Sequence, residues 1–115
     1  MLSGDSHAFW ANELHDAGGV RVAAEFGTTG ISSPSIGDVL VGAPLDEALV
    51  ERNKEVRYTN QAAKGFVLLT LTREAASADM VAVSTVYAPT YETSTLKRFR
   101  VAPAESGVGA LAEVS

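Results

Sequence analysis

The amino-acid sequence predicts an α+β domain, in which a mainly antiparallel sheet of about four to five strands is accompanied by two short helices. Three observations indicate this class. Alternating or continuous β-like apolar segments dominate the second half of the chain, and two segments of the first half have helical spacing. Residues 73–76, between the two longest apolar segments, form a connection short enough for a hairpin.

The first predicted element is a short helix over residues 8–16. Trp10 and Leu14 lie four residues apart and would share one face of that helix. Ser6 stands where a side chain can cap the helix N-terminus, and a glycine pair follows as a left-handed stop. Residues 1–3 ahead of this helix are expected to be the end of a strand.

The next element is a half-buried strand over residues 20–26, where apolar and polar positions alternate. Arg21 and Glu25 share one side of this strand, so we expect an exposed ion pair of about 0.5 kcal/mol between them. Residues 27–37 are rich in Gly, Ser, Thr and Pro and are expected to form a loop.

A second helix is expected over residues 44–53. Pro44 suits the first turn of a helix, and Asp46 and Glu47 place negative charge at the positive end of the helix dipole.

Three strands are predicted in the remainder of the chain, over residues 65–72, 77–86 and 93–102. In the last of them, Leu96 falls on one side and Phe99 on the other, with charges interleaved. From residue 103 onward Gly, Ala and Ser dominate without periodicity, so residues 103–115 are expected to form a flexible tail.

Composition limits the function classes. A chain of 115 residues forms one domain at most. Nine Lys and Arg against fourteen Asp and Glu, with no basic stripe, argue against a nucleic-acid partner. The absence of cysteine excludes disulfides and zinc-thiolate sites. No apolar run approaches the roughly 20 residues that span a bilayer, so no membrane partner is expected.

The candidate functional residues are Asp5, Ser6 and His7, close to the N-terminus. Ser6 as a nucleophile would need a histidine base, and the Asp-x-x-His unit of Gly-Asp-Ser esterases is missing. Asp5 and His7 would face the same side of an extended segment, and a carboxylate with an imidazole suits Fe, Mn or Zn. Alternatively, Asp5 and Ser6 only cap the predicted helix.

Three motifs taken together favour the metal interpretation: "SGDSHAFWANEL", "GGVRVAAEFGTTGISSP" and "RYTNQAAKGFVLLTLTREAASADMV". In order and spacing they resemble the C-terminal part of PhoD-like phosphatases (alkaline phosphatase D), which belong to the calcineurin-like metallophosphoesterases. The resemblance covers most of residues 3–102. It implies that residues 1–102 are a C-terminal fragment of a phosphatase catalytic domain, similar to the C-terminal half of a calcineurin-like sandwich.

The resemblance also implies a function. The parent would hydrolyse phosphate mono- or diesters with bound metals, either calcium with iron or manganese and zinc, and would be periplasmic or secreted. Asp5 and His7 would be metal ligands, and residues 27–37 would form part of the active-site rim. This chain would bring no catalytic residue of its own and would be inactive alone. The alternative is a non-enzymatic α+β interaction module in which the Asp-Ser-His cluster is only a helix cap.

A missing half would leave a sheet face uncovered. The apolar residues expected on that face are Val67, Leu69 and Leu71, with Val81 and Val83 on the next strand. Large exposed apolar patches and open sheet edges favour association. We therefore expect a homo-oligomer that uses this face.

Overall fold

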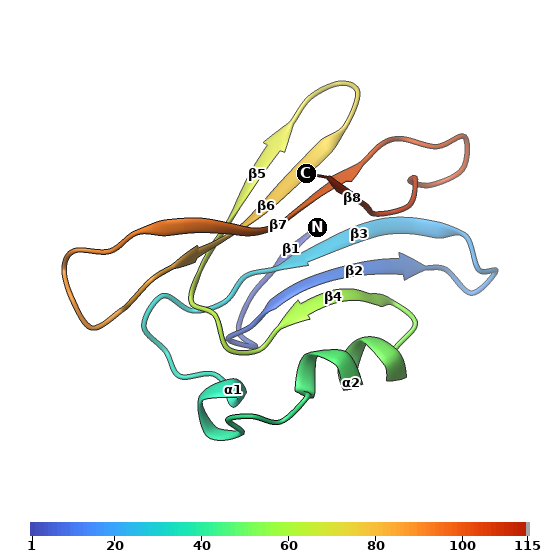
Figure 1. Ribbon diagram of the computed structural model, residues 1–115. Helices are drawn as coiled ribbons and strands as arrows, with labels where there is room; N and C mark the ends of the chain where they lie inside the picture. Colours follow the sequence, from blue (N-terminus) through green and yellow to red (C-terminus); the bar gives the residue numbers. More distant parts are fainter. Residues whose placement is uncertain (115) are drawn as a thin grey trace.

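The computed structural model of the chain describes residues 1–114 and consists of two facing β-sheets with two short helices on one side (Figure 1). The elements are β1 (Leu2–Ser3), β2 (Phe9–His15), β3 (Arg21–Gly27), α1 (Ile36–Val39), α2 (Leu45–Arg52), β4 (Val56–Asn60), β5 (Gly65–Leu71), β6 (Ala76–Val83), β7 (Thr93–Val101) and β8 (Ala112–Val114). One sheet has the order β1-β3-β2-β4 and the other the order β5-β6-β7-β8.

The sheets confirm the predicted antiparallel pairing and correct the predicted size. Every pair of neighbouring strands is antiparallel except β1 and β3, which are parallel. The expected single sheet of four to five strands is two sheets of four strands each. Strand β1 is the strand end expected at residues 1–3, whereas β4 and β8 were not predicted because they are short and show little alternation.

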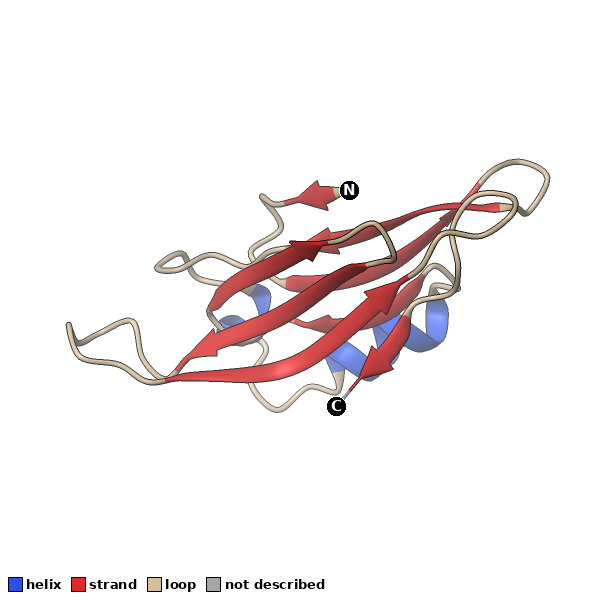
Figure 2. Cartoon of the chain, turned by 90° about the horizontal axis from the view of Figure 1, so that it is seen from above, coloured by secondary structure: helices blue, strands red, loops and turns tan. Residues whose placement is uncertain are grey.

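The hydrophobic core lies between the two sheets, whose strands run over one another in the view of Figure 2. Both sheets contribute small and large apolar residues: Phe9, Ala11, Ala24, Phe26, Ala78, Met80, Phe99, Val101 and Leu111. The helices lie on the other side of the first sheet, where α2 packs beside β4. Burial between the sheets is therefore the main stabilising contribution.

The predicted helix over residues 8–16 is wrong, because this segment forms β2. Its burial alternates along the strand, and Phe9, Ala11 and Glu13 are buried while their neighbours are less so. Residues four apart share a face in a strand as well as in a helix, because four is an even number. The segment is a strand because its backbone pairs with β3 on one side and with β4 on the other.

The strand predicted over residues 20–26 is confirmed as β3, but its expected ion pair is wrong. Arg21 pairs with Glu13 of β2, and Arg57 approaches the same carboxylate at 3.2 Å. Glu25 instead accepts a hydrogen bond from Asn12 Nδ2 at 3.1 Å. Glu13 lies on the neighbouring strand, and its side chain is only 5% exposed, so it is the carboxylate that needs cations.

The three strands predicted in the second half are confirmed as β5, β6 and β7. The side chains of Leu96 and Phe99 nevertheless do not face opposite sides of the sheet. Met80 pairs with Lys97 whereas the next residue, Val81, pairs with Thr95, so Leu96 is the extra residue of a β-bulge. The bulge resets the alternation and packs Leu96 against the same core as Phe99.

The flexible tail expected over residues 103–115 is also corrected, up to the last described residue. Its end forms β8 beside β7, and Leu111 is buried in the core. Ser115, the last residue of the expected tail, lies outside the described residues. The short strand and single buried leucine leave no periodic pattern to recognise, because their partners are far away in sequence.

A turn at Gly107 ties this segment to the first sheet. Gly107 has φ 74°, and a Cβ atom there would lie 1.9 Å from the Arg21 carbonyl oxygen. The next residue, Val108, donates its N–H to that same oxygen at 3.0 Å. Glycine is required here because a side chain would collide with the strand that the segment contacts.

The helix predicted over residues 44–53 is confirmed as α2, and residues 27–37 are mostly loop, with α1 beginning at Ile36. Within residues 1–114, neither helix has the length and apolar character that crossing a membrane requires.

Candidate functional site

The loop that joins β1 to β2 carries Asp5, Ser6 and His7 in an unusual backbone conformation. Asp5 has φ 71° and His7 has φ 57°, in the left-handed region that residues other than glycine seldom adopt. The Ser6 N–H donates to the Gly4 carbonyl at 2.9 Å and closes a tight turn around Asp5. The extended segment expected from the sequence is therefore wrong. Backbone strain of this kind is concentrated at functional sites.

Trp10 fastens this loop to the start of β2. Its Nε1–H donates to Ser6 Oγ at 2.8 Å, so Ser6 caps no helix. Opposite Trp10 in the sheet is Gly27, where a Cβ atom would lie 2.9 Å from the indole Cδ1. The absence of a side chain at Gly27 thus leaves the space that the indole occupies.

His7 is held at two points. Its Nδ1 lies 2.8 Å from the Pro34 carbonyl oxygen, and its own carbonyl accepts a hydrogen bond from the buried Thr29 Oγ1 at 3.1 Å. A carbonyl oxygen only accepts, so Nδ1 carries the hydrogen. In the neutral ring, the Nε2 lone pair is then available to an external donor or a cation.

Asp5 is exposed, and among the described residues its carboxylate makes no hydrogen bond or ion pair. A carboxylate oxygen and an imidazole nitrogen are suitable ligands for a hard or borderline divalent cation. Residues 1–114 nevertheless contain no group of three or more His, Cys, Asp or Glu side chains that could hold a metal ion. Asp5 and His7 thus offer donor types that suit a metal, but within residues 1–114 they are not gathered with a third such side chain.

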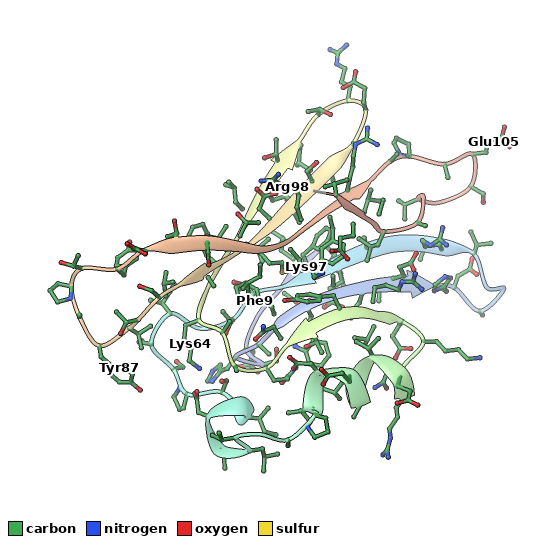
Figure 3. The ribbon with its side chains drawn as sticks, viewed as in Figure 1. Phe9, Lys64, Tyr87, Lys97, Arg98 and Glu105 are labelled. Atoms are coloured by element: carbon green, nitrogen blue, oxygen red, sulfur yellow. The ribbon has the colours of Figure 1, made fainter. Side chains whose placement is uncertain are left out.

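The loop that supplies Pro34 is fixed by three polar residues that sequence reasoning missed. Asp38 Oδ2 accepts the Ser35 N–H at 2.7 Å and a hydrogen bond from Lys64 Nζ at 2.9 Å. Lys64 also donates to Ser35 Oγ at 2.8 Å, and it lies just before β5 (Figure 3). The Ser-x-x-Asp spacing at the start of α1 was the available signal, because it is a variant of the capping box.

Buried polar groups join this region to the core. Thr59 Oγ1 donates to the Phe9 carbonyl at 2.8 Å, and Gln61 Nε2 donates to Thr59 Oγ1 at 2.6 Å. The backbone carbonyl of Gln61 in turn accepts the Gly37 N–H at 3.1 Å. A Cβ atom at Gly37 would lie 2.6 Å from that oxygen. The start of β2, the end of β4 and α1 are thus linked, which limits movement of the loop that contacts His7.

The charge on Asp38 makes a prediction about acid stability. The hydrogen bond from Lys64, followed by that from the Ser35 backbone, lowers the pKa of Asp38 from 3.8 to about 2. A carboxyl whose pKa is depressed in the folded state stabilises the fold above its unfolded pKa, and this contribution is lost between pH 3.8 and about 2. We expect Asp38→Asn to lower the urea midpoint at pH 7 and the difference from the wild type to shrink through this window. A difference that is constant with pH would contradict this account.

Comparisons with known proteins agree with the motifs. The family model of the PhoD-like phosphatases matches residues 1–80. A solved structure described as "Structure of PhoD" superimposes with a TM-score of 0.71 and 24% sequence identity, over 99% of this chain and 22% of that one. No curated protein matches the chain.

The structural match shows a shared fold, and the chain spans about a fifth of the PhoD chain that it matches. The family match covers well over half of this chain and includes Asp5, His7, the Pro34 loop and Lys64. On this evidence, the chain belongs to the PhoD-like phosphatase family.

Proposed function

We propose that this chain is a C-terminal segment of the catalytic domain of a metal-dependent phosphoesterase of the calcineurin-like type. In this proposal, Asp5 and His7 are metal ligands, and residues 27–37 form part of the rim of the site. The observation that carries it is the hydrogen bond from His7 Nδ1 to the Pro34 carbonyl. Histidines that bind metals usually donate their other ring N–H to a carbonyl or carboxylate, which directs the free nitrogen at the metal.

When bound, metals in such a site polarise the phosphoryl group and lower the pKa of a coordinated water. This chain would contribute a neutral nitrogen donor from His7 and a charged oxygen donor from Asp5. Those two donors are compatible with calcium and iron, or with manganese and zinc. A catalytic metal has at least three protein ligands, and the described residues bring together no such group. The remaining ligands would come from other parts of a longer protein.

The proposal predicts that the purified 115-residue chain hydrolyses an aryl phosphate at no more than a trace rate in the presence of calcium and iron. In a longer natural protein that contains this chain, Asp5→Asn and His7→Gln are expected to abolish metal-dependent hydrolysis. His15→Gln is the matched control, because His15 ends β2, is exposed and should leave the rate unchanged. Robust metal-dependent turnover by the chain alone, or full activity of His7→Gln, would contradict the proposal.

The alternative interpretation, a non-enzymatic module in which Asp-Ser-His only caps a helix, loses its basis. The segment expected to be a helix contains β2 (Phe9–His15), and the Ser6 hydroxyl accepts the hydrogen bond from Trp10.

We also propose that the chain associates with itself through the outer face and edge of β5, which is the last strand of its sheet. Of the residues expected on the open face, Leu71 is 70% exposed, and three others need correction. Val67 and Leu69 pack against the core and Val81 is buried, whereas Phe66 and Leu68 are 40% and 53% exposed. An exposed apolar strand at a sheet edge favours pairing with another chain.

Light scattering at high micromolar concentration is expected to give the mass of a dimer. Leu68→Lys should shift the equilibrium toward the monomer, because it places a charge on the exposed strand. Val41→Lys, at a site that is 83% exposed and outside both sheets, is the matched control. A wild-type chain that remains monomeric would refute this association.

A further inference from the structure

We propose that Asp38 is a positioning residue for His7 and acts on the imidazole through the peptide bond between Pro34 and Ser35. Lys64 holds the Asp38 carboxylate in place. The importance of this arrangement for a cation rests on the proposed function, but the hydrogen-bond chain itself does not.

The proposal depends on one peptide group that is hydrogen-bonded at both ends. Its carbonyl oxygen, from Pro34, lies 2.8 Å from His7 Nδ1. Its N–H, from Ser35, donates to Asp38 Oδ2 at 2.7 Å. Residues 1–114 contain no cis peptide bond, so this planar group directs its C=O and N–H in opposite directions. His7 and Asp38 therefore lie on opposite sides of the same amide.

Such a chain of hydrogen bonds is cooperative. A carboxylate that accepts the Ser35 N–H polarises the amide and makes the Pro34 oxygen a stronger acceptor. The stronger acceptor favours the ring tautomer with hydrogen on His7 Nδ1, which leaves Nε2 unprotonated. A carboxylate bonded directly to a metal-binding histidine has this effect, and here the amide would transmit it.

Lys64 fixes the Asp38 end of this series of hydrogen bonds. Its Nζ donates to Asp38 Oδ2 at 2.9 Å and to Ser35 Oγ at 2.8 Å, and its side chain is only 13% exposed. The ammonium group thus keeps the carboxylate aligned with the Ser35 N–H. Three segments of the chain, around residues 7, 34–38 and 64, meet in this arrangement.

Asp46 provides a matched control. Its Oδ1 accepts a backbone N–H, from Gln61, at 3.0 Å, and it lies in the first turn of a helix, as Asp38 does. The peptide that Asp46 contacts joins Asn60 to Gln61, and within the described residues neither Asn60 nor Gln61 forms a hydrogen bond with His7. Removing either carboxylate costs a hydrogen bond to a backbone N–H, and removing Asp38 also costs its bonds to Ser35 Oγ and Lys64 Nζ. Only the bond of Asp38 leads to the imidazole through a single peptide group.

The test is long-range ¹H–¹⁵N NMR of the histidine rings in the 115-residue chain without metal, at a pH where the rings are neutral. The chain has two histidines, so His15→Gln assigns the His7 signals. We expect His7 to be mainly the Nδ1–H tautomer in the wild type and in Asp46→Ala. Asp38→Ala should shift the equilibrium toward Nε2–H, and Asp38→Asn should lie between, because its amide oxygen can still accept the Ser35 N–H without charge.

Lys64→Met keeps the proposal testable if Asp38→Ala disturbs the loop, because it retains the Asp38 carboxylate and removes only the ammonium group that aligns it with the Ser35 N–H. Its His7 tautomer should also shift toward Nε2–H. Unchanged tautomer populations in both Asp38→Asn and Lys64→Met would overturn the proposal.

Zinc titration of the same samples separates this inference from the proposed function. Zinc is expected to perturb the His7 signals, with roughly 10-fold weaker apparent affinity in Asp38→Asn. If the tautomer depends on Asp38 but zinc leaves His7 unaffected, the inference stands and the metal-ligand role fails. If zinc binds equally in the wild type and in Asp38→Asn while the tautomer is unchanged, the metal-ligand role stands and the inference fails.

Discussion

Replacement of Phe9 by alanine is expected to lower the free energy of unfolding by about 3–5 kcal/mol. Phe9 is fully buried between the sheets and is the first residue of β2. Its removal would leave a cavity that the facing residues of the second sheet cannot fill, because both sheets are fixed by their backbone pairing. Urea unfolding should show a lower midpoint with an unchanged slope, since the surface exposed on unfolding hardly changes.

Phe66→Ala is the control for this prediction, because it removes the same side chain from a site that is 40% exposed. We expect it to cost clearly less than Phe9→Ala. Similar losses for both variants would show that the space between the sheets is not the main core. Phe9 also lies two residues after His7, so its variant should loosen the loop that holds the imidazole.

Replacement of Gly65 by alanine is expected to destabilise the chain by more than about 3 kcal/mol or to prevent folding. A Cβ atom at Gly65 would lie 1.9 Å from the Val81 carbonyl oxygen and 2.9 Å from the Ala82 Cα. Both atoms belong to the backbone of β6, so relief requires separation of the paired strands. Thermal unfolding followed by circular dichroism would measure the loss.

Gly18→Ala is the matched control, because a Cβ atom there would meet only Asp16 Oδ1 at 3.4 Å, an ordinary contact distance. It should unfold within a few degrees of the wild type. If Gly65→Ala is equally mild, the close approach of β5 and β6 at this point is refuted. Because Lys64 precedes Gly65, a separation of these strands should also weaken the contact of Lys64 with Asp38.

The elements that were predictable are those whose pattern is local. Alternation over β3 and the β-rich composition of β5, β6 and β7 identified four strands, and the acidic first turn identified α2. β2 was not predictable from its own residues, since the spacing of Trp10 and Leu14 suits a helix and a strand equally. Its strand conformation follows from its two neighbours in the sheet.

For the candidate site, the sequence by itself determined the two candidate residues, Asp5 and His7, the family motifs and their order along the chain. Only the tertiary structure decided what surrounds them. His7 and Pro34 are 27 residues apart, and Ser35 and Lys64 are 29 residues apart. Contacts at such separations arise from the pairing of strands and the packing of loops, and side-chain spacing along the chain carries no record of them.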